Sequence, residues 1–367
     1  MANDFHNHAQ LARTRRLREL LRELPDICSD YFLSIEQLTS PLTRLSYAYD
    51  LKLFFQYLSE ELPKFSGKPI TEFTIDDIRK ITKQDLERFA RYLSFYVKNE
   101  SQDDGQVLSK EITNHEYGIK RKFASLRAFY KYLFSEGLIE GNTAALIPLP
   151  KLHERAIIRL DIDEVARILD LAENGQSLPN TYRKFHNVTR LRDLAMLSLF
   201  LGTGIRISEC VGLNIDDFDF EQNAFVVTRK GGKEVILYLS DEVSAALKDY
   251  LAERREIEAL PGHENAFFLS IQKRRISQRA VENMVKKYAS IAAPLKKKIS
   301  PHKLRSTFGT NLYRETGDIY LVADVLGHSD VNTTRKHYAA IAEDHRRIAA
   351  QKTILREDPV HMLPDEE

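Results

Sequence analysis

Pro301-His302-Lys303-Leu304-Arg305 is the most informative stretch of this sequence, because two other stretches complete it. They are Thr203-Gly204-Ile205-Arg206 and Leu326-Gly327-His328, and Tyr338 follows ten positions after His328. Two arginines, two histidines and a tyrosine suit neither a metal site nor a hydrolase triad. They do suit the attack of a tyrosine hydroxyl on a phosphodiester, because the cations neutralise the phosphate while the imidazoles handle protons and hydrogen bonds.

Length and composition predict a soluble globular protein of two domains. The chain has 367 residues, of which 43% are apolar and 29% charged, so each of two domains could bury its own core. No run of about 18 apolar residues occurs, and the N-terminus lacks the pattern of a signal peptide. The two cysteines, Cys28 and Cys210, lie far apart and exclude a disulfide framework. We therefore expect a cytoplasmic protein.

The distribution of charge is more informative than the formal net charge of +1, which by itself argues weakly against a nucleic-acid partner. Between Lys273 and Lys303 there are ten lysines and arginines and one acid, Glu282. A second basic cluster lies in the first 25 residues, and acidic residues gather at the C-terminus. Taken alone, either basic run is best interpreted as a solvated helix face, so DNA binding has to be argued from the motifs.

The first half of the chain is predicted to be helical. Apolar residues recur at helical spacing in three segments, residues 43–58, 82–96 and 119–133. Gly137 ends the third of them, and Thr82 with Asp85 forms a capping box at the start of the second. Residues 8–24 could add a basic amphipathic helix, whereas the polar residues 99–114 look like a loop.

A stiff connector follows this helical half. Two prolines two positions apart, in Ile147-Pro148-Leu149-Pro150-Lys151, favour an extended chain. We place the linker at residues 148–153. The domains on either side are then residues 1–147 and residues 154–367.

The second half mixes helices and strands. Residues 224–229 and 234–239 are rich in β-formers on either side of Lys230-Gly231-Gly232-Lys233, which predicts a β-hairpin. Residues 173–189 are polar and look like an exposed loop, and residues 267–269 suggest a short strand. Helices are expected at residues 161–171, 191–201, 206–213, 277–292, 301–315 and 319–326, with another that Ser240 opens.

Each motif alone has an ordinary structural interpretation. Arg206 could form a surface salt bridge with Glu209, three residues later. His302 and Arg305 share one helix face, but such pairs occur by chance in large proteins. His328 could simply cap a helix, and the chain has 16 tyrosines. The conjunction of these residues therefore carries the functional interpretation.

With these segments in this order and spacing, residues 191–341 resemble the catalytic domain of the tyrosine recombinase (phage integrase) family, with a Xer-like pattern. The first half resembles the helical core-binding domain of that family, so the resemblance covers roughly residues 40–345. It implies a mainly α fold, in which an N-terminal helical bundle and an α+β catalytic domain with a small antiparallel sheet form a C-shaped clamp on DNA. The matching segments are residues 202–209, 213–219, 302–310 and 326–334, closed by Tyr338.

The resemblance also implies catalytic roles for named side chains. Arg206 and Arg305 would hold the scissile phosphate. Tyr338 would be the nucleophile, and His302 and His328 would assist it.

Two more positions follow from the resemblance. Glu209 falls where the family often has an acid that supports the site. The catalytic lysine of the family lies on a β-hairpin, in a Gly-Lys-Gly-x-Lys-Glu pattern. Aligning residues 229–234 with that pattern selects Lys230, with Lys233 as the alternative.

The implied reaction conserves the energy of the broken bond. Tyr338 would attack the phosphorus in line, release a 5′-hydroxyl and leave a 3′-phosphotyrosine, so no cofactor and no metal is required. Exchange between two duplexes implies, by resemblance, a homotetramer in which a C-terminal helix, about residues 340–355, docks on a neighbour. The expected partner is a double-stranded DNA recombination site, an FtsK-type DNA translocase is a candidate accessory partner, and no membrane is involved.

Within the family, a Xer-like recombinase that resolves chromosome dimers for chromosome partition and cell division is favoured, because residues 1–38 leave little room for a separate arm-binding domain. The alternative is an integrase or excisionase of a mobile element, in which the ten-residue spacing from His328 to Tyr338 is common, whereas many chromosomal members have nine. A catalytically inactive DNA-binding protein is less favoured, since the catalytic set is intact. A type IB topoisomerase shares the chemistry but acts as a monomer without paired sites.

Overall fold

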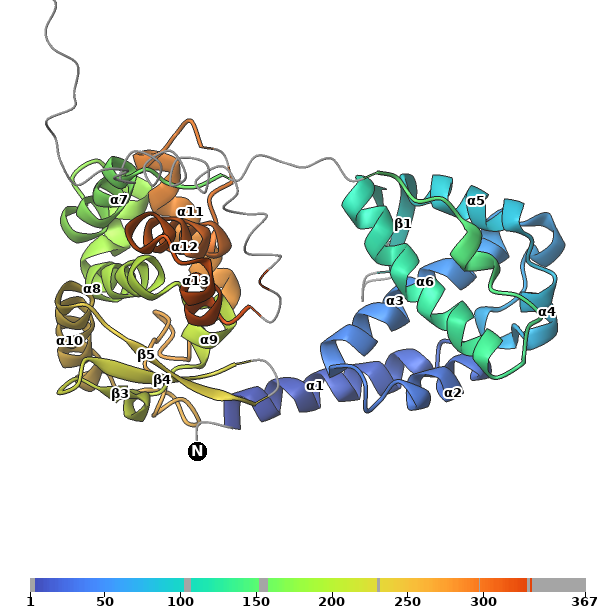
Figure 1. Ribbon diagram of the computed structural model, residues 1–367, viewed down its shortest axis with the longest axis horizontal. Helices are drawn as coiled ribbons and strands as arrows, with labels where there is room; N and C mark the ends of the chain where they lie inside the picture. Colours follow the sequence, from blue (N-terminus) through green and yellow to red (C-terminus); the bar gives the residue numbers. More distant parts are fainter. Residues whose placement is uncertain are drawn as a thin grey trace, which may run out of the picture. The chain divides into compact units, whose positions relative to one another are not determined.

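Helices make up most of the structure, as the sequence predicts. The computed structural model describes residues 4–101, 107–151, 158–229, 232–296, 298–328 and 331. The chain divides into two compact units, residues 3–155 and residues 156–367 (Figure 1). The expected linker at residues 148–153 lies partly outside the described residues, so its bounds stay a prediction. No helix in the described part of the chain combines the length and the apolar character needed to cross a membrane.

The first unit is a helical bundle with one β-hairpin. Its elements are α1 (Asp4–Leu21), α2 (Asp26–Ser34), α3 (Pro41–Glu61), η1 (Pro63–Phe65), η2 (Ile70–Glu72), α4 (Ile75–Arg79), α5 (Lys83–Tyr92), β1 (Phe95–Ser101), β2 (Val107–Thr113), α6 (Glu116–Ser135) and η3 (Thr143–Leu146). Helix α3 packs against α6, and both turn aromatic side chains into one core. Among them Phe54, Phe55, Phe123 and Phe129 are fully buried.

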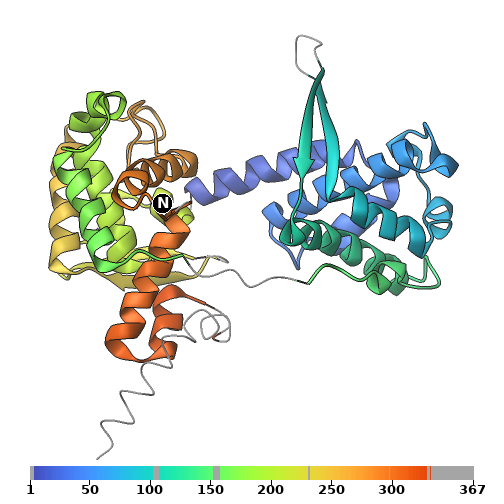
Figure 2. The same cartoon turned by 90° about the horizontal axis from the view of Figure 1, so that it is seen from above.

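The hairpin corrects the expectation of a loop at residues 99–114. Strands β1 and β2 pair antiparallel from Phe95 with Thr113 to Ser101 with Val107, and the ribbon projects from the helices (Figure 2). Helix α5 accordingly ends at Tyr92, and Tyr96 belongs to β1. A ribbon that projects from the helices needs few apolar residues, so its polar composition does not distinguish it from a loop.

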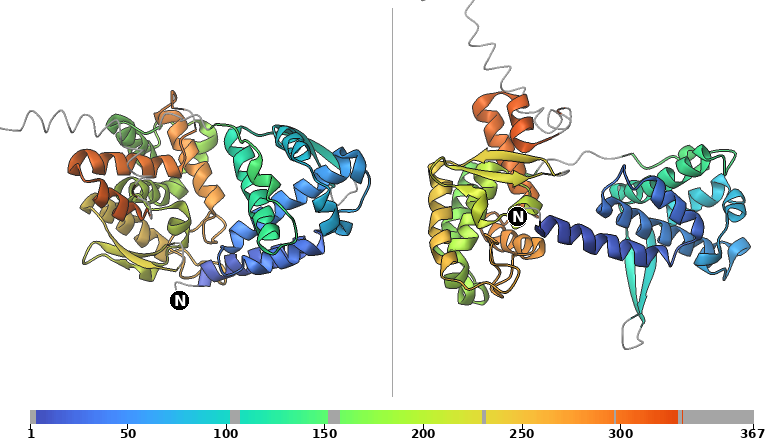
Figure 3. Two further views of the ribbon diagram at one scale, coloured as in Figure 1. Left: turned by 45° about the vertical axis from the view of Figure 1, so that its right-hand side comes forward. Right: turned by 90° about the horizontal axis from the view of Figure 1, so that it is seen from below.

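The second unit combines a group of helices with a small sheet (Figure 3). Three strands, β3 (Phe218–Asp219), β4 (Ala224–Thr228) and β5 (Glu234–Tyr238), form an antiparallel sheet in that order, and the predicted hairpin is confirmed. The helices are α7 (Ile162–Asn174), α8 (Asn180–Thr203), α9 (Ile207–Gly212), η4 (Ile215–Asp217), α10 (Asp241–Arg255), α11 (Gln278–Ala292), α12 (Pro301–Thr316) and α13 (Ile319–Leu326).

Helix α8 is the central element of this unit. It packs against α7, α10 and α12, and residues 195–200 are all buried. The sequence predicts only its second half, because residues 180–189 were expected to be a loop. These residues form the first turns of the same helix, in which Tyr182, Phe185 and Val188 are exposed. Residues 267–269 do not form the expected strand, since Leu269 alone among them makes an isolated β-bridge, with Arg275.

Candidate active site

The C-terminal end of helix α13 is the point at which the predicted site residues meet. The helix ends at Gly327, which adopts the left-handed conformation with φ of 61°, and the amide of His328 donates to the carbonyl oxygen of Ala323 at 2.9 Å. The last carbonyl groups of a helix lack partners within it and carry a partial negative charge. The end of α13 therefore attracts cationic donors.

Three arginines from three elements supply those donors. Each guanidinium belongs to a different part of the second unit: the end of strand β4, the residue before helix α9, and helix α12. Together the three side chains donate hydrogen bonds to four consecutive carbonyl oxygens at the end of α13. The pairs are Arg229 with Asp324 and Val325, Arg305 with Leu326, and Arg206 with Gly327.

Arg206 is held by the start of helix α9. It is the N-cap residue, and its amide donates to Glu209 Oε2 at 2.9 Å in a capping box. Its Nη1 donates to Glu209 Oε1 at 2.7 Å, and its Nη2 donates to the oxygen of Gly327 at 2.7 Å. The side chain of Arg206 stays 33% exposed, whereas Glu209 is buried. Two hydrogen bonds use fewer than half of the five N–H donors of a guanidinium, so Arg206 is suited to receive an anion.

Arg305 lies on the inner face of helix α12 and is buried. Its Nη1 donates to the oxygen of Gly204, and its Nη2 donates to the oxygen of Leu326. Gly204 ends helix α8 with φ of 62°, and an added Cβ there would lie 2.4 Å from Phe308 and 2.9 Å from Leu326. Only glycine leaves room for α12 and α13 to approach the end of α8.

Arg229 is a part of this arrangement that sequence reasoning did not single out. Its Nη1 donates to the oxygen of Asp324 at 3.2 Å, and its Nη2 donates to the oxygen of Val325 at 2.6 Å. Burial and the charge of Arg206 lower the pKa of Arg229, against the opposing effect of Glu209. A signal was present in the sequence, since the aligned family pattern has glycine at this position.

One predicted histidine lies on the helix that carries Arg305, and the other follows the helix end that the arginines contact. His302 is in the first turn of α12, three positions before Arg305, and it is exposed. His328 directly follows Gly327 and is half-buried. Two predicted site residues, Lys230 and Tyr338, lie outside the described residues, as does the predicted C-terminal helix near residues 340–355.

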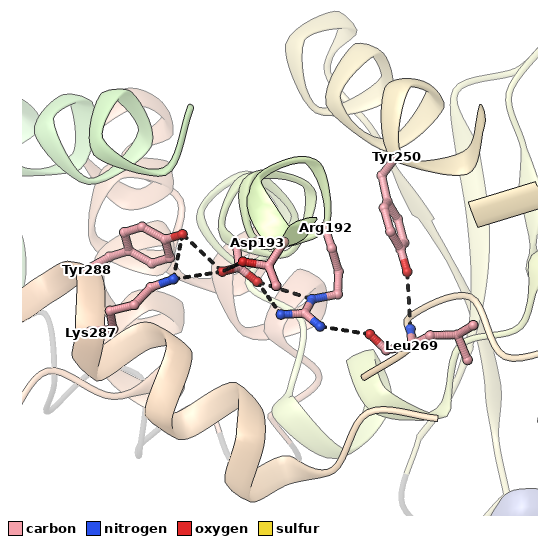
Figure 4. A network of polar contacts seen from close by, with 7 residues as sticks. Arg192, Asp193, Tyr250, Leu269, Lys287 and Tyr288 are labelled. Atoms are coloured by element: carbon pink, nitrogen blue, oxygen red, sulfur yellow. Dashed lines mark hydrogen bonds and ion pairs between the residues drawn. The ribbon is translucent and has the colours of Figure 1, made fainter. Parts of the chain in front are cut away.

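A second polar cluster in this unit joins helices α8 and α11 and is an internal brace (Figure 4). The carboxylate of Asp193 accepts from Arg192 Nη2 at 2.7 Å, from Lys287 at 3.0 Å and from the Tyr288 hydroxyl at 3.0 Å. Burial would raise the pKa of Asp193, but the two cations lower it below its ordinary value. Burial and Asp193 raise the pKa of Tyr288, which is fully buried and therefore unsuited to attack a phosphate.

A pocket of about 500 Å³ lies beside this brace. Arg192, Asp193 and Lys287 line it, with Tyr182 and Phe185 among the other lining residues. None of the predicted catalytic residues within the described ranges contributes to the pocket. Within those ranges, no group of three or more His, Cys, Asp or Glu side chains could hold a metal ion.

The arrangement at the end of α13 is suited to binding a phosphodiester. Carbonyl groups of the same helix end hold Arg206 and Arg305, His302 lies on the helix that carries Arg305, and His328 directly follows that helix end. Two guanidinium groups can neutralise a phosphate and the larger negative charge of its pentacoordinate transition state.

Known proteins resemble this chain in sequence over nearly its whole length. The model of the Phage integrase family matches residues 159–345. Tyrosine recombinase XerC of Caldanaerobacter subterraneus subsp. tengcongensis is 34% identical over 334 residues, which are 90% of this chain and 86% of the relative. Tyrosine recombinase XerC of Syntrophus aciditrophicus is 30% identical over 331 residues, which are 88% of this chain and 93% of the relative.

Solved structures share the fold at lower identity. The XerH site-specific recombinase bound to palindromic difH substrate, in a post-cleavage complex, matches with a TM-score of 0.61 and 19% identity, over 85% of this chain and 80% of the other. The Tn1549 transposon integrase in complex with circular intermediate DNA matches with a TM-score of 0.62 and 20% identity, over 88% of this chain and 98% of the other. The mainly α fold with small antiparallel sheets is thereby confirmed.

Proposed function

Because the chain belongs to the phage integrase family and is a tyrosine site-specific recombinase that cleaves and rejoins DNA strands, we propose a specific set of side chains for its chemistry. Tyr338 is the nucleophile, and Arg206 and Arg305 bind the scissile phosphate. His302 and His328 assist by hydrogen bonding and proton transfer. Glu209 supports the site by holding Arg206.

In each step of the reaction, the phosphorus exchanges one bonded oxygen for another. The Tyr338 oxygen forms a bond to phosphorus as the bond from phosphorus to the 5′-oxygen breaks, which leaves a 3′-phosphotyrosine and a free 5′-hydroxyl. The departing 5′-oxygen takes a proton from a lysine on the β4–β5 hairpin, Lys230 or alternatively Lys233. A 5′-hydroxyl of another strand then reverses the step, so the chemistry consumes neither a cofactor nor a metal.

One observation carries the proposal: Arg206 and Arg305, 99 positions apart in the sequence, donate to consecutive carbonyl oxygens at the end of α13. A chance pair of surface arginines would have no reason to share a helix end with His328. Losing one such electrostatic contact typically costs on the order of 3 kcal/mol of barrier, or about a hundredfold in rate.

The test of the nucleophile is a suicide substrate with a nick near the cleavage point. The wild-type protein should form a covalent protein–DNA adduct in EDTA. Tyr338→Phe should bind the same DNA and form no adduct, while Tyr313→Phe, on helix α12, should retain it. An adduct that persists in Tyr338→Phe would remove this residue from its role. Failure of the wild type to form any adduct would favour a catalytically inactive DNA-binding protein.

The proposed biological role is XerC-like resolution of chromosome dimers in the cytoplasm. Its substrate is a double-stranded recombination site that the two units clamp, and its active form is a homotetramer on two duplexes with exchange of the C-terminal helix. An FtsK-type translocase is the proposed accessory partner. Recombination between two marked plasmids, each carrying the site, separates this role from a type IB topoisomerase, which would relax DNA without exchanging markers.

An integrase or excisionase of a mobile element is the second candidate, because ten positions separate His328 from Tyr338. Selection of binding sites from random DNA distinguishes the two roles. A site found once near the replication terminus of the host chromosome supports dimer resolution, and a site at the ends of a mobile element supports integration.

A further inference from the structure

Arg229 stands at the first position of the turn that carries both candidate lysines. Its amide donates to the oxygen of Lys233 at 2.8 Å, and its own oxygen accepts from the amide of Gly232 at 3.0 Å. Lys230 follows it directly in the chain. The backbone of Arg229 is therefore the point from which this turn leaves strand β4, whichever lysine is the acid.

The side chain of Arg229 attaches this point to helix α13. Both terminal nitrogens donate to the last turn of the helix, at the oxygens of Asp324 and Val325. The next two carbonyl groups along the chain accept from Arg305 and Arg206. A rigid planar guanidinium that makes two hydrogen bonds fixes orientation as well as distance.

Gly327 is shaped to receive this side chain. An added Cβ at Gly327 would lie 2.1 Å from Nη1 and 2.5 Å from Cζ of Arg229, so the guanidinium lies directly on the glycine. The guanidinium of Arg229 therefore packs directly against Gly327, the residue before His328.

We propose that Arg229 is a positioning residue that aligns the lysine-bearing turn with the phosphate-binding arginines, by anchoring the turn to the same helix end that orders Arg206 and Arg305. The inference rests on the proposed function, since it assumes that a lysine of this turn protonates the leaving 5′-oxygen. Arg229 itself need not touch DNA. Its loss should therefore affect the proton transfer and leave phosphate binding intact.

The experiment compares two suicide substrates, one with the natural 5′-oxygen at the cleaved bond and one with sulfur in its place. A thiolate leaves without a proton because a thiol is far more acidic than an alcohol, so the sulfur substrate does not need the general acid. Arg229→Met keeps the apolar stem and removes the donors. It should cleave the oxygen substrate on the order of tenfold to a hundredfold more slowly than wild type and cleave the sulfur substrate at a near wild-type rate. Arg229→Lys should fall between the two, since it keeps a charge but loses the planar pair of donors.

The readout is the ratio of the cleavage rates on the two substrates. Both substrates meet the same fraction of folded protein, so any effect of partial unfolding cancels from this ratio. Arg254→Met is the matched control. Arg254, on helix α10, donates to three carbonyl oxygens, those of Ala266, Ile257 and Glu264. None of these belongs to the candidate active site, so the loss of Arg254 should lower stability without changing the ratio.

Three outcomes would overturn the inference or its premise, and they can be told apart. If Arg229→Met is slow on both substrates, Arg229 acts on the phosphate or the fold, and the inference fails while the recombinase function stands. If it is slow on neither, Arg229 has no role in cleavage. If neither Lys230→Ala nor Lys233→Ala recovers on the sulfur substrate, the assignment of the general acid to this turn is wrong, and adduct formation through Tyr338 remains a separate measurement.

Discussion

Glu209 shows at the scale of single residues how a local motif becomes part of a site. Its carboxylate closes the capping box of α9 through the amide of Arg206 and binds the guanidinium of the same residue. Arg206 is thereby held between its own helix start and Gly327. The salt bridge between Arg206 and Glu209, three positions apart, is the ordinary interpretation of this pair. It is present, and it also orients Arg206, the candidate for binding the phosphate.

Glu209→Gln should slow adduct formation while leaving the helix in place. A glutamine can accept one of the two hydrogen bonds, but its amide nitrogen then faces an N–H group of Arg206, and the negative charge is lost. We expect a loss of about 1–3 kcal/mol in stability and a markedly slower cleavage step, measured by urea unfolding and with the suicide substrate. The control is Glu282→Gln, which removes an exposed pair with Arg279 and should change neither quantity. Equal effects of the two substitutions would contradict a special role for Glu209.

Asp77 gives a prediction of pH dependence in the first unit. Burial would raise the pKa of this carboxyl, but hydrogen bonds from Lys68 and Thr74 outweigh it and lower the pKa to about 2. Because the folded pKa lies below the unfolded one, the stabilisation is present above the unfolded pKa and is lost as the pH falls through the folded pKa. The difference corresponds to about 2 kcal/mol near neutral pH.

Urea unfolding of Asp77→Asn at several pH values tests this. The variant should be less stable than wild type at pH 6, and the gap should narrow as the pH falls from about 4 towards 2. Asp76→Asn removes a neighbouring exposed pair with Arg79 and should stay close to wild type throughout. A gap that is independent of pH would show that the carboxylate charge is not the cause.

At the scale of elements, the C-terminal ends of two helices shape the site. Helix α8 ends at Gly204, whose oxygen accepts from Arg305 on α12, and α13 ends at Gly327 beside Arg206. Both glycines have positive φ, at 62° and 61°. The site is thus assembled from helix termini, where unpaired carbonyl groups are available to hold cationic side chains.

Gly204→Ala should strongly destabilise the second unit. The added methyl group would meet Phe308 and Leu326, and its backbone would be strained at positive φ. The two effects together should cost roughly 2–4 kcal/mol. Gly262→Ala separates them, because Gly262 has φ of 83° with nothing within 4 Å of the added Cβ, and it should cost only about 1 kcal/mol. Thermal unfolding measures both, and equal losses would contradict the packing argument.

At the scale of the whole molecule, the basic run from Lys273 to Lys303 is not one uniform surface. Several of its cations are used within the second unit, as when Lys287 binds Asp193 and Lys296 binds both Asp161 and Glu164. Others in the run are exposed, including Lys273, Arg274, Lys286 and Lys298. A net charge of +1 is therefore compatible with a strongly basic DNA-binding face.

DNA binding should weaken steeply with salt, because contacts to phosphates release counterions. Affinity is expected to fall on the order of 10³-fold between about 50 and 200 mM salt if some six phosphates are contacted. Tyr338→Phe is the protein to use, since it removes cleavage without removing a charge. Equilibrium binding measured across this range should give a linear log–log plot, and binding that is insensitive to salt would contradict a phosphate-dominated interface.

The local elements could be predicted because their signals are local. Thr82 with Asp85, and Asp161 at the start of α7, form the caps that the sequence indicates. The expectations failed where polarity was taken as a sign of irregular chain, at residues 99–114 and residues 180–189. There a projecting ribbon and a largely exposed helical segment need few apolar residues, so composition alone cannot identify them.

The sequence by itself indicated the family, most of the helices and the candidate catalytic side chains, because each motif and each cap depends on residues a few positions apart. Only the tertiary structure decided that Arg206, Arg229 and Arg305 share the end of one helix. The sequence separation across these contacts is 121 positions for Arg206, 95 and 96 for Arg229, and 21 for Arg305. The contacts exist only once packing has brought the helix ends together. Arg229 is the clearest case, since its neighbours in the chain say nothing of the carbonyl groups that it holds.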